Sequence, residues 1–442
     1  MAPDESQGSN RFISRRDVIR SAGAAGVVGL AGCTGGGGGD GGDGGDGGDG
    51  GDGGDGGGTT PTATPGSAEM DTIRIGAVHP LTGPYGALAE FQQQGLKLAV
   101  KEINAAGILD REVESVHGDT QLDPQTGKQV ARRFVEDNDV HMLTGAISSS
   151  VAIAIHEFAA QENLPYMAPG AANSMTMNNC KRTTFRYEMR AQQTGVATAP
   201  WAVDNFGSNV WIHNADYSWG NSVGNAWKAQ ARNARSDVEV LGHTKSQLGA
   251  TDFSSYISQI AASDADWVAT GVNGGDAVNF LKQAESYGLK GNVEIVSPTN
   301  AFSFIRKAAG AAAQDTYATV RYYEKYNTPA NKLFVNKFTD EYGRPPDNFA
   351  HVVWVHAWTY ANAVAQAGST NTDDVISALE QISYDGPMGT VTYRECDHQT
   401  QRPVQLGKIV APKDYDWPDI SVMETISAED AISPCSETGC QF

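Results

Sequence analysis

Three consecutive serines, Ser148 to Ser150, follow a short apolar run and precede an amphipathic segment, so they are expected to join a strand to a helix. The first backbone N–H groups of a helix have no partner within it, and the helix dipole is positive at that end. A carboxylate can therefore accept hydrogen bonds from these groups and from the Ser149 hydroxyl. Serine is also a preferred N-cap, and we expect one of the three to cap the helix in any case.

The sequence shows no arrangement typical of a catalytic or metal site. It has no His-Glu-x-x-His, no phosphate-binding loop ending in Gly-Lys-Ser/Thr and no paired Cys-x-x-Cys. His351 and His356 are five residues apart, so they do not share a helix face as zinc ligands would. Residues 352–367 instead predict a core helix with its tryptophans facing inward. We therefore expect no enzyme activity, no metal and no cofactor.

The N-terminus has the pattern of an export signal. Arg15 and Arg16 form a twin-arginine pair, and the weakly apolar stretch Ser21–Gly32 follows them. That stretch has about a dozen residues, whereas a spanning helix needs roughly 20, so it predicts an export segment and not an anchor helix. It ends in a Leu-Ala-Gly-Cys sequence that resembles a lipobox, in which Cys33 would accept the lipid. Residues 1–32 therefore predict a twin-arginine lipoprotein signal; a chance arginine pair is the alternative.

Residues 33–70 are predicted to form a flexible tether. Most of the segment repeats Gly-Gly-Asp, and the Thr/Pro-rich run Thr59–Pro65 follows. Calcium-binding Gly/Asp repeats need an apolar residue in each unit, and collagen needs proline in its triplets; the repeat has neither. The 37 residues Thr34–Met70 have an r.m.s. reach of about 33 Å. Such a segment suits a spacer between a lipid anchor and a folded domain.

The chain is acidic. Its formal net charge is −20 at pH 7, and without residues 1–32 and the six Asp of the repeat it still has 43 acidic against 28 basic residues. A surface of this sign repels nucleic acid and anionic membranes, so neither is expected as a partner. It also resembles the surfaces of proteins from salt-loving organisms, in which salt screens the self-repulsion.

Four cysteines remain besides Cys33, and outside the cell they can form disulfides. Cys435 and Cys440 are close enough in sequence to pair with each other. Cys180 and Cys396 are the other two, so three connectivities are possible, and the sequence does not choose among them.

From about Asp71 the chain alternates short apolar runs with amphipathic segments of helical period. One helical face stops at Gly107, which suits the C′ position, and Asp123-Pro124 is typical of a helix start. This order predicts parallel sheets covered by helices on both faces, in two successive α/β units. Ligands of such sheets bind beyond the carboxyl ends of the strands. The predicted strands lie at 72–78, 113–117, 140–144, 164–168, 209–213, 238–241, 265–270 and 293–296.

Several motifs resemble those of branched-chain amino acid binding proteins of ABC importers. Each motif is weak alone, but their order and spacing from Asp71 to about Val410 are specific. The motifs are His79-Pro-Leu-Thr-Gly-Pro-Tyr-Gly86, Gly118-Asp-Thr-Gln-Leu-Asp-Pro124, the loop from Gly145 to Ser150, Asn163–Ala171, Asp216-Tyr-Ser-Trp-Gly220 and Tyr287-Gly-Leu-Lys290.

This resemblance implies the type I periplasmic-binding fold, in which two doubly wound α/β lobes are joined by a hinge of three strands. The chain would cross between the lobes near residues 190, 320 and 385. Cys180 and Cys396 then fall in different lobes, so a disulfide between them would restrain closure and is not expected. Lobe 1 would comprise residues 71–190 and 320–384, and lobe 2 residues 191–319 and 385–442, including a C-terminal tail.

The resemblance also implies ligand-binding residues between the lobes. Ser149 would bind a ligand carboxylate, and the Gly170 carbonyl would face a ligand ammonium. Tyr85 and Trp219, the latter where the family usually has tyrosine, would sandwich the apolar part of the ligand. Both aromatic residues could equally be core packing residues. The full predicted set is Tyr85, Ser148, Ser149, Ser150, Gly170, Ala171, Ala172, Trp219 and Thr299.

Two positions depart from the family's pattern. Ala172 stands where the family often has serine or threonine, and Thr299 stands where many amino-acid binders have an acid. Without that acid, a ligand α-ammonium lacks its usual counter-charge. Asp276 could substitute from a neighbouring loop, but it could equally cap the helix that begins there.

The leading hypothesis is an exported binding protein, lipid-anchored at the outer face of the cell membrane, that delivers an amino acid-like ligand to ABC permease subunits. Branched-chain amino acids are the leading ligand class. The alternative ligand is a carboxylate, amide or urea-like solute without an α-ammonium. A surface ligand sensor on the same fold and a secreted hydrolase are the remaining functional hypotheses.

Overall fold

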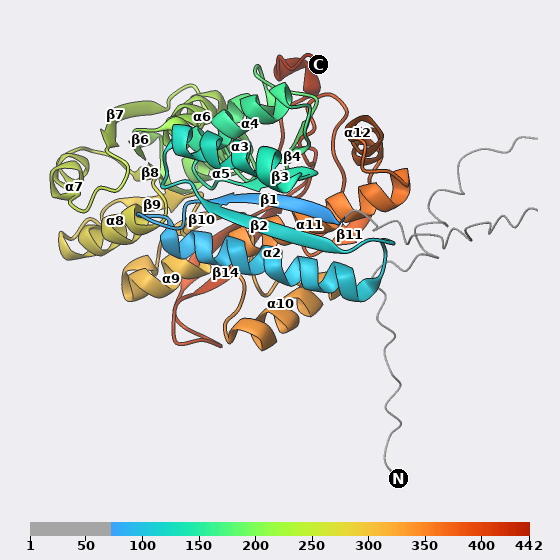
Figure 1. The fold of residues 1–442 in the computed structure, drawn as a ribbon. Helices are drawn as coiled ribbons and strands as arrows, with labels where there is room; N and C mark the ends of the chain where they lie inside the picture. The colour runs from blue at the N-terminus through green and yellow to red at the C-terminus, as the bar shows by residue number, and fades with distance from the viewer. Residues whose placement is uncertain (1–71) are drawn as a thin grey trace, which may run out of the picture. The chain divides into compact units, whose positions relative to one another are not determined.

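Two open β-sheets organise the part of the chain that the computed structural model describes, residues 72–442 (Figure 1). The strands of the first sheet are β1 (Ile73–His79), β2 (Val113–Asp119), β3 (Met142–Gly145), β4 (Tyr166–Met167) and β5 (Thr184–Phe185). They run parallel in the order β2-β1-β3-β4-β5. The central strand β1 is buried along nearly its whole length, as expected for a parallel strand covered on both faces.

The predicted signal and tether, residues 1–70, lie outside the described residues. The same holds for the export residues Arg15 and Arg16 and for the lipidation site Cys33.

Helices cover both faces of the first sheet. In Figure 1, α2 (Gly86–Ala106) lies on one side of β1 and β2, and α3 (Pro124–Asn138) and α4 (Ser149–Gln161) lie on the other. α2 ends as predicted, because Gly107 follows it in the left-handed conformation at φ 58°. α3 begins as predicted, because the Asp123 carboxylate accepts a 2.7 Å hydrogen bond from the Thr126 N–H.

Three further helices follow late in the chain: α10 (Pro329–Tyr342), α11 (Asn348–Ala367) and α12 (Thr372–Glu380). α11 packs against α2, and nearly all of its residues are buried. The core helix predicted around His351 and His356 is thereby confirmed. Both histidines are fully buried on it.

The second sheet is mixed. Its strands are β6 (Asn209–Ala215), β7 (Glu239–Ser246), β8 (Trp267–Gly271), β9 (Glu294–Ser297), β10 (Tyr317–Val320), β13 (Val404–Val410) and β14 (Asp419–Ile426). They follow the order β14-β13-β10-β9-β8-β6-β7. β6 to β10 are parallel, whereas β13 and β14 are antiparallel to their neighbours. The eight predicted strands are confirmed within a few residues, whereas β5 of the first sheet and β10, β13 and β14 of this sheet were not predicted.

The helices that follow the strands of the second sheet are α5 (Ala191–Phe206), α6 (Ser218–Ala234), α7 (Ser254–Ala261), α8 (Gly275–Ser286) and α9 (Ser303–Ala309). α5 and α6 pack side by side, and the indole of Trp227 donates a 3.0 Å hydrogen bond to the Thr194 hydroxyl. The short elements are the hairpin β11 (Tyr384–Gly386) and β12 (Gly389–Val391) and the turns η1 (Asn173–Thr176), η2 (Gly310–Ala313) and η3 (Cys435–Glu437).

Both sheets have a strand order that creates a binding crevice. β1 lies between β2 and β3, and β6 lies between β7 and β8, so the chain reverses its direction across each sheet at these strands. Ligands of such sheets bind at the reversal point, outside the carboxyl ends of the strands. The loops after β1 and β3, and those after β6 and β8, are therefore the segments in which a site is expected.

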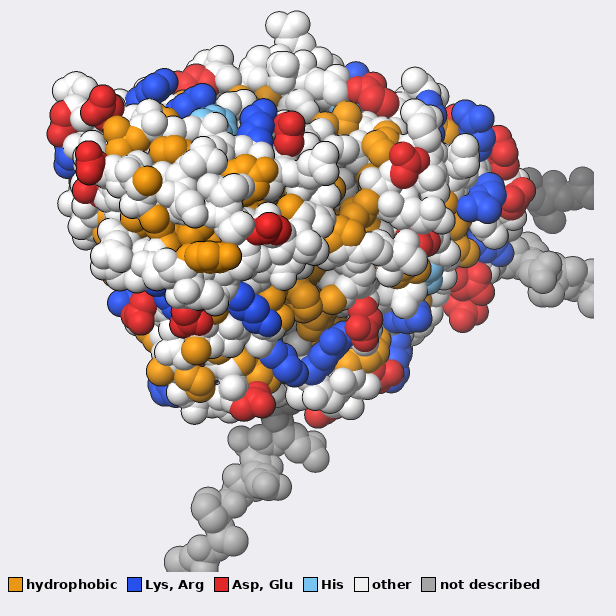
Figure 2. Space-filling model, turned by 90° about the vertical axis from the view of Figure 1, so that its left-hand side faces the viewer, with side chains coloured by type: hydrophobic (Ala, Val, Ile, Leu, Met, Phe, Trp, Pro, Cys, Tyr) orange, Lys and Arg blue, Asp and Glu red, His pale blue; other side chains and the backbone are white. Residues whose placement is uncertain are grey.

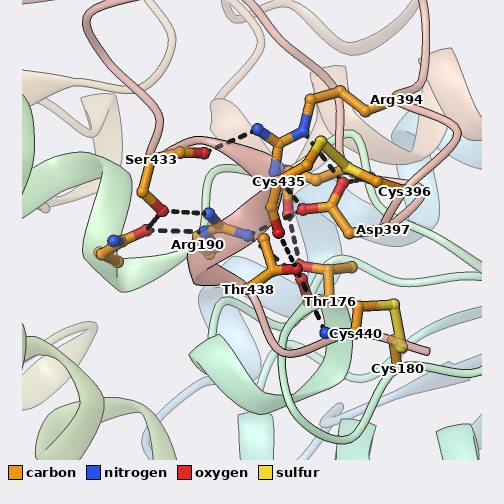
Figure 3. A network of polar contacts seen from close by, with 12 residues as sticks. Thr176, Cys180, Arg190, Arg394, Cys396, Asp397, Ser433, Cys435, Thr438 and Cys440 are labelled. Carbon is orange, nitrogen blue, oxygen red and sulfur yellow. Dashed lines mark hydrogen bonds and ion pairs between the residues drawn. A yellow bond between two sulfur atoms is a disulfide. The ribbon is translucent and has the colours of Figure 1, made fainter.

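Two disulfides tie the C-terminal segment to earlier parts of the chain (Figure 3). Cys180 pairs with Cys440, and Cys396 pairs with Cys435. Cys435 and Cys440 therefore do not pair with each other, although they are neighbours in sequence. The expectation that Cys180 and Cys396 do not pair is confirmed.

A buried ion pair lies beside these disulfides (Figure 3). The Arg190 guanidinium is 3.1 Å from the Asp397 carboxylate, and both side chains are fully buried. Arg190 also donates to the Ser433 hydroxyl at 3.0 Å, and Arg394 pairs with the same carboxylate. The C-terminal segment is thus held by charge-assisted hydrogen bonds as well as by covalent bonds.

Figure 2 shows one face of the molecule, on the side of α7 and α8. Acidic and basic side chains are interspersed on it, and apolar side chains gather between them. Within residues 72–442, no helix combines the length and the apolar character needed to cross a bilayer.

Candidate functional site

The loops at the reversal points of the two sheets contact each other. Tyr85, after β1, places its hydroxyl 2.6 Å from the hydroxyl of Tyr217, after β6. The Pro84 carbonyl accepts a 3.4 Å hydrogen bond from the N–H of Gly275, after β8. Tyr85 is fully buried and shares an apolar cluster with Val272 and other residues of the second sheet. The carboxyl ends of the two sheets therefore face each other.

Gly274 allows this close approach. Its φ of +59° lies in the left-handed region, and an added Cβ would lie 2.8 Å from the Tyr85 ring and 2.9 Å from the Pro84 carbonyl oxygen. Any side chain at this position would both strain the backbone and displace the loop that carries Tyr85.

Two of the predicted serines present polar groups at the N-terminus of α4. Ser148 occupies the N-cap position but caps no backbone N–H, and its buried Oγ has no hydrogen-bond partner within residues 72–442. The Ser149 Oγ accepts from the N–H groups of Ala171 (3.1 Å) and Ala172 (3.0 Å), so its own proton is left for an acceptor. The expectation that a serine of this run caps the helix through its side chain is therefore wrong.

Ser150 and Trp219 contribute to the contact between the sheets. The Ser150 Oγ lies 3.0 Å from the Ser218 Oγ at the start of α6. Trp219 is buried in an apolar cluster that joins Ala171, after β4, to residues of the second sheet, and its ring centroid lies 6.1 Å from that of Tyr217. Tyr217, and not Trp219, therefore meets Tyr85. Tyr217 stands in one of the motifs but was not among the predicted ligand-binding residues. Alternation along the chain does not show which aromatic residue faces the other sheet.

Arg186 holds the loop after β4. It is fully buried, and its Nη1 donates to the carbonyl oxygens of Gly170 (3.2 Å) and Ala172, while its Nε donates to Gln399 at 2.6 Å. Burial lowers the pKa of Arg186 to about 9, so the guanidinium is still charged at neutral pH. The Gly170 carbonyl, expected to face a ligand ammonium, thus has a cation of the protein as its partner. Arg186 was not among the site residues predicted from the sequence.

Thr299 and Asp276 are both engaged within the second sheet and its helices. Thr299 is fully buried, and its hydroxyl donates to the Val272 carbonyl at 2.8 Å and lies 3.0 Å from the Ser297 hydroxyl. Asp276 lies in the first turn of α8, and its carboxylate accepts a 2.9 Å hydrogen bond from the Gly249 N–H. Burial raises the pKa of Asp276 to about 6.

Arg321, which follows β10, is a further buried cation near the site. Its guanidinium lies 5.2 Å from the Phe302 ring centroid and 2.9 Å from the Glu188 carboxylate. Burial raises the pKa of the two tyrosines at the contact, and the charge of Arg321 counteracts part of that rise. Arg402 lies 4.0 Å from the same carboxylate, and its Nε and Nη1 have no partner among the described residues. Two buried guanidinium groups thus share one carboxylate.

One stretch has the residue spacing of a hydrolase nucleophile elbow but lies within a helix. Residues 220–224 have Gly-x-Ser-x-Gly spacing, but they lie inside α6 and not at a strand-to-helix turn, where a nucleophile would be exposed. Within residues 72–442, no group of three or more His, Cys, Asp or Glu side chains is arranged to hold a metal ion.

Known proteins share this architecture. Residues 72–414 match the Periplasmic binding protein family. Leu/Ile/Val-binding protein homolog 2 of Brucella abortus (strain 2308) is 28% identical over 329 residues, which cover 74% of this chain and 86% of the relative. A periplasmic binding protein of Burkholderia mallei aligns with a TM-score of 0.78 and 23% identity, covering 84% of this chain and 98% of that one.

A solute binding protein of R. palustris in complex with benzoate aligns with a TM-score of 0.74 and 21% identity, covering 84% of this chain and 100% of that one. The likeness to these solved structures agrees with the fold of two α/β sheets. Because the family match spans most of the described residues, this chain belongs to the periplasmic binding protein family.

Proposed function

We propose that this protein is a lipid-anchored extracellular solute-binding protein, which captures a small carboxylate-bearing solute and delivers it to an ABC importer. The observation that carries the proposal is the donor set at the N-terminus of α4. There the buried Ser148 hydroxyl has no partner among the described residues, and the Ser149 hydroxyl has its proton free. Both lie at a reversal point of the first sheet, opposite the loops of the second.

A carboxylate is the group that these donors suit. α4 has 13 residues, so its aligned peptide dipoles place partial positive charge at Ser148 and Ser149. A buried hydroxyl without a partner costs free energy, and an anionic acceptor placed there would remove that cost. Each hydroxyl can donate one hydrogen bond to such a ligand.

The names of the relatives support a carboxylate as the shared group. The B. abortus protein is named for leucine, isoleucine and valine, and the R. palustris protein holds benzoate. All four compounds have a carboxylate, whereas only the amino acids also have an α-ammonium. Branched-chain amino acids are therefore one candidate ligand class, and carboxylates without the ammonium are the other.

We assign the chain to two lobes that close on the ligand. Lobe 1 comprises residues 71–190 and 320–384, and lobe 2 comprises residues 191–319 and 385–442. The Cys180–Cys440 disulfide links the C-terminal tail to lobe 1, so the tail would stay with lobe 1 when the rest of lobe 2 moves. The hydrogen bonds of Tyr85 with Tyr217 and of Ser150 with Ser218 would form only on closure. A ligand held by both lobes favours the closed state through its differential affinity.

We assign the export signal to Arg15 and Arg16 and the lipid anchor to Cys33, at the outer face of the cell membrane. The two disulfides support an oxidising compartment, since such bonds persist outside the cytosol. Permease subunits of an ABC importer are the expected protein partners.

Titration calorimetry with leucine, 4-methylpentanoate and benzoate tests the carboxylate site. At least one compound should bind, raise the melting temperature and make the protein more compact in small-angle scattering. Ser148→Ala should weaken binding roughly tenfold without lowering the stability of the ligand-free protein, because this hydroxyl has no hydrogen-bond partner among the described residues.

Ser149→Ala is the matched comparison. It should weaken binding and also lower stability, because it leaves the N–H groups of Ala171 and Ala172 unpaired. Absence of binding by all three carboxylates would overturn the proposed function.

A further inference from the structure

We infer that the solute of this site is a carboxylate with an apolar body and no α-ammonium group. The inference rests on the proposed function and narrows its ligand class. It follows from the partners of the carbonyl, hydroxyl and carboxylate groups around the site, which leave donors for an anion but few acceptors for a cation.

The carbonyl groups of the loop after β4 are turned to the protein's own donors. Arg186 Nη1 donates to the Gly170 and Ala172 oxygens, and the Ala191 N–H donates to the Ala171 oxygen at 2.8 Å. A carbonyl oxygen has a second lone pair, but the Arg186 charge lies 3.2 Å from the Gly170 oxygen. An ammonium that approached this oxygen would meet a buried like charge, which is poorly screened.

The second sheet offers no replacement at Thr299. Its hydroxyl proton is donated to the Val272 carbonyl, and its oxygen lies 3.0 Å from the Ser297 hydroxyl. Thr299 is also uncharged, so it cannot provide the negative charge with which a carboxylate side chain would balance a ligand ammonium. The hydroxyl is already satisfied without a ligand.

Asp276 is the one remaining acid that the sequence offered as an ammonium partner. The Gly249 N–H donates to both oxygens of its carboxylate, at 3.2 Å to Oδ1 and 2.9 Å to Oδ2. The carboxylate also lies in the first turn of α8, where the helix dipole is positive. These contacts explain its position by the local structure alone. Its charge still reaches the Tyr85 and Tyr217 hydroxyls, so a variant at this residue is needed as a control.

The hinge side of the site adds positive charge. Arg321 and Arg402 share the single Glu188 carboxylate, so these three groups have an excess of one positive charge. Two nitrogen atoms of the buried Arg402 guanidinium have no hydrogen-bond partner among the described residues, and the group lies over the Tyr187 ring at 4.8 Å from its centroid. Buried and uncompensated positive charge favours an anionic ligand over a zwitterion, whose ammonium it repels.

Aromatic side chains supply the surface for an apolar body. Tyr85, Phe302 and Phe349 belong to one buried cluster, which joins residues of the second sheet to Tyr85 and to the start of α2. The Phe302 and Phe349 rings are edge to face at 5.6 Å between centroids. The same cluster contains Ile147, which precedes Ser148, so it connects the start of α4 to these aromatic side chains. Hydrogen-bond donors together with aromatic rings are the features that an aliphatic or aromatic monocarboxylate requires.

Titration calorimetry with 4-methylpentanoate against leucine tests the inference, because the two differ only in the α-ammonium. The analogue should bind at least tenfold more tightly, the change expected when a charged group loses one charge-assisted hydrogen bond. Leucine binding equal to or tighter than the analogue would overturn the inference and leave the proposed function standing. Absence of binding by the analogue, leucine and benzoate would overturn both.

Variants at the two acid positions provide the controls. Asp276→Asn keeps an oxygen acceptor for the Gly249 N–H and removes the charge, so the ratio of the two affinities should not change. A selective loss of leucine binding would show that Asp276 holds an ammonium and would contradict the inference. Thr299→Glu should raise leucine affinity relative to the analogue at least tenfold, whereas the uncharged Thr299→Gln should not.

Discussion

The hydroxyl of Tyr85 lies 2.6 Å from that of Tyr217, and this bond joins the first loop of one sheet to the first loop of the other. Burial raises the pKa of both phenols well above the ordinary value, so both hydroxyls are neutral at physiological pH. The rings meet edge to face at 6.5 Å between centroids. A neutral hydrogen bond with ring contact therefore stabilises the approach of the two sheets.

Removal of this bond should weaken ligand binding through the closed state. Tyr217→Phe keeps the ring and leaves the Tyr85 hydroxyl unpaired, at a cost of about 1–3 kcal/mol to closure, or roughly fivefold to a hundredfold in affinity. Calorimetry with 4-methylpentanoate measures the loss, and small-angle scattering measures the reduced compaction. Tyr85→Phe should have the same effect, and the double variant should be little worse than either; additive losses would contradict a shared bond.

Acid should destabilise the protein through its buried histidines. Burial lowers the pKa of His356 to about 3 and that of His79 to about 4, both below the ordinary 6.5. At pH values between these lowered pKa values and 6.5, the unfolded chain binds more protons than the folded one. Stability therefore falls as the pH is lowered from about 6.5 toward 4. His356→Gln should flatten this dependence by up to about 1.4 kcal/mol per pH unit in urea unfolding. An unchanged slope would contradict a neutral buried His356.

Loss of either disulfide should lower the free energy of unfolding by roughly 2–5 kcal/mol. The Cys180–Cys440 bond spans 260 residues and the Cys396–Cys435 bond spans 39, so the paired serine variant of the first should lose more. Denaturant unfolding measures both losses. Peptide mapping without reduction should recover these two pairs, and a Cys435–Cys440 pair would refute the connectivity.

Lipidation should depend on Cys33 and export on the arginine pair. Cys33→Ser should yield a precursor that lacks the lipid mass, which intact-mass spectrometry detects. Arg15→Lys with Arg16→Lys should retain folded protein inside the cell, as shown by cell fractionation. Lipidated and exported protein in both variants would refute the signal assignment.

The strand–helix rhythm was predictable from the sequence because apolar period and helix boundaries are local properties. Gly107 and Asp123 mark helix ends by their own conformational and hydrogen-bonding preferences, and the structure confirms both. The antiparallel strands β13 and β14 were not predicted. They join the second sheet only after the chain has returned from α12, and local pattern does not show which sheet a late strand joins.

The candidate site likewise combines features that the local sequence predicted with contacts that only the folded chain creates. The apolar pattern predicted strands before Tyr85, Ser149 and Thr299, and the resemblance to a known family selected these residues. All three follow the carboxyl ends of strands. Their partners come from distant parts of the chain: Tyr217 is 132 residues from Tyr85, and Ala171 is 22 residues from Ser149. The first pairing depends on how the two sheets approach each other, and the second on how the loops after β3 and β4 of the first sheet pack together.

The sequence by itself determined the class of fold and predicted the loops in which a site is expected. Its resemblance to a known family marked Thr299 as a position where many amino-acid binders have an acid. Only the tertiary structure decided that Arg186 takes the Gly170 and Ala172 carbonyls, that Ser148 has no partner among the described residues, and how the cysteines pair. The physical reason is that strand and helix patterns arise from neighbouring residues. Hydrogen-bond partners, buried charges and disulfides arise from residues that folding brings together across long separations.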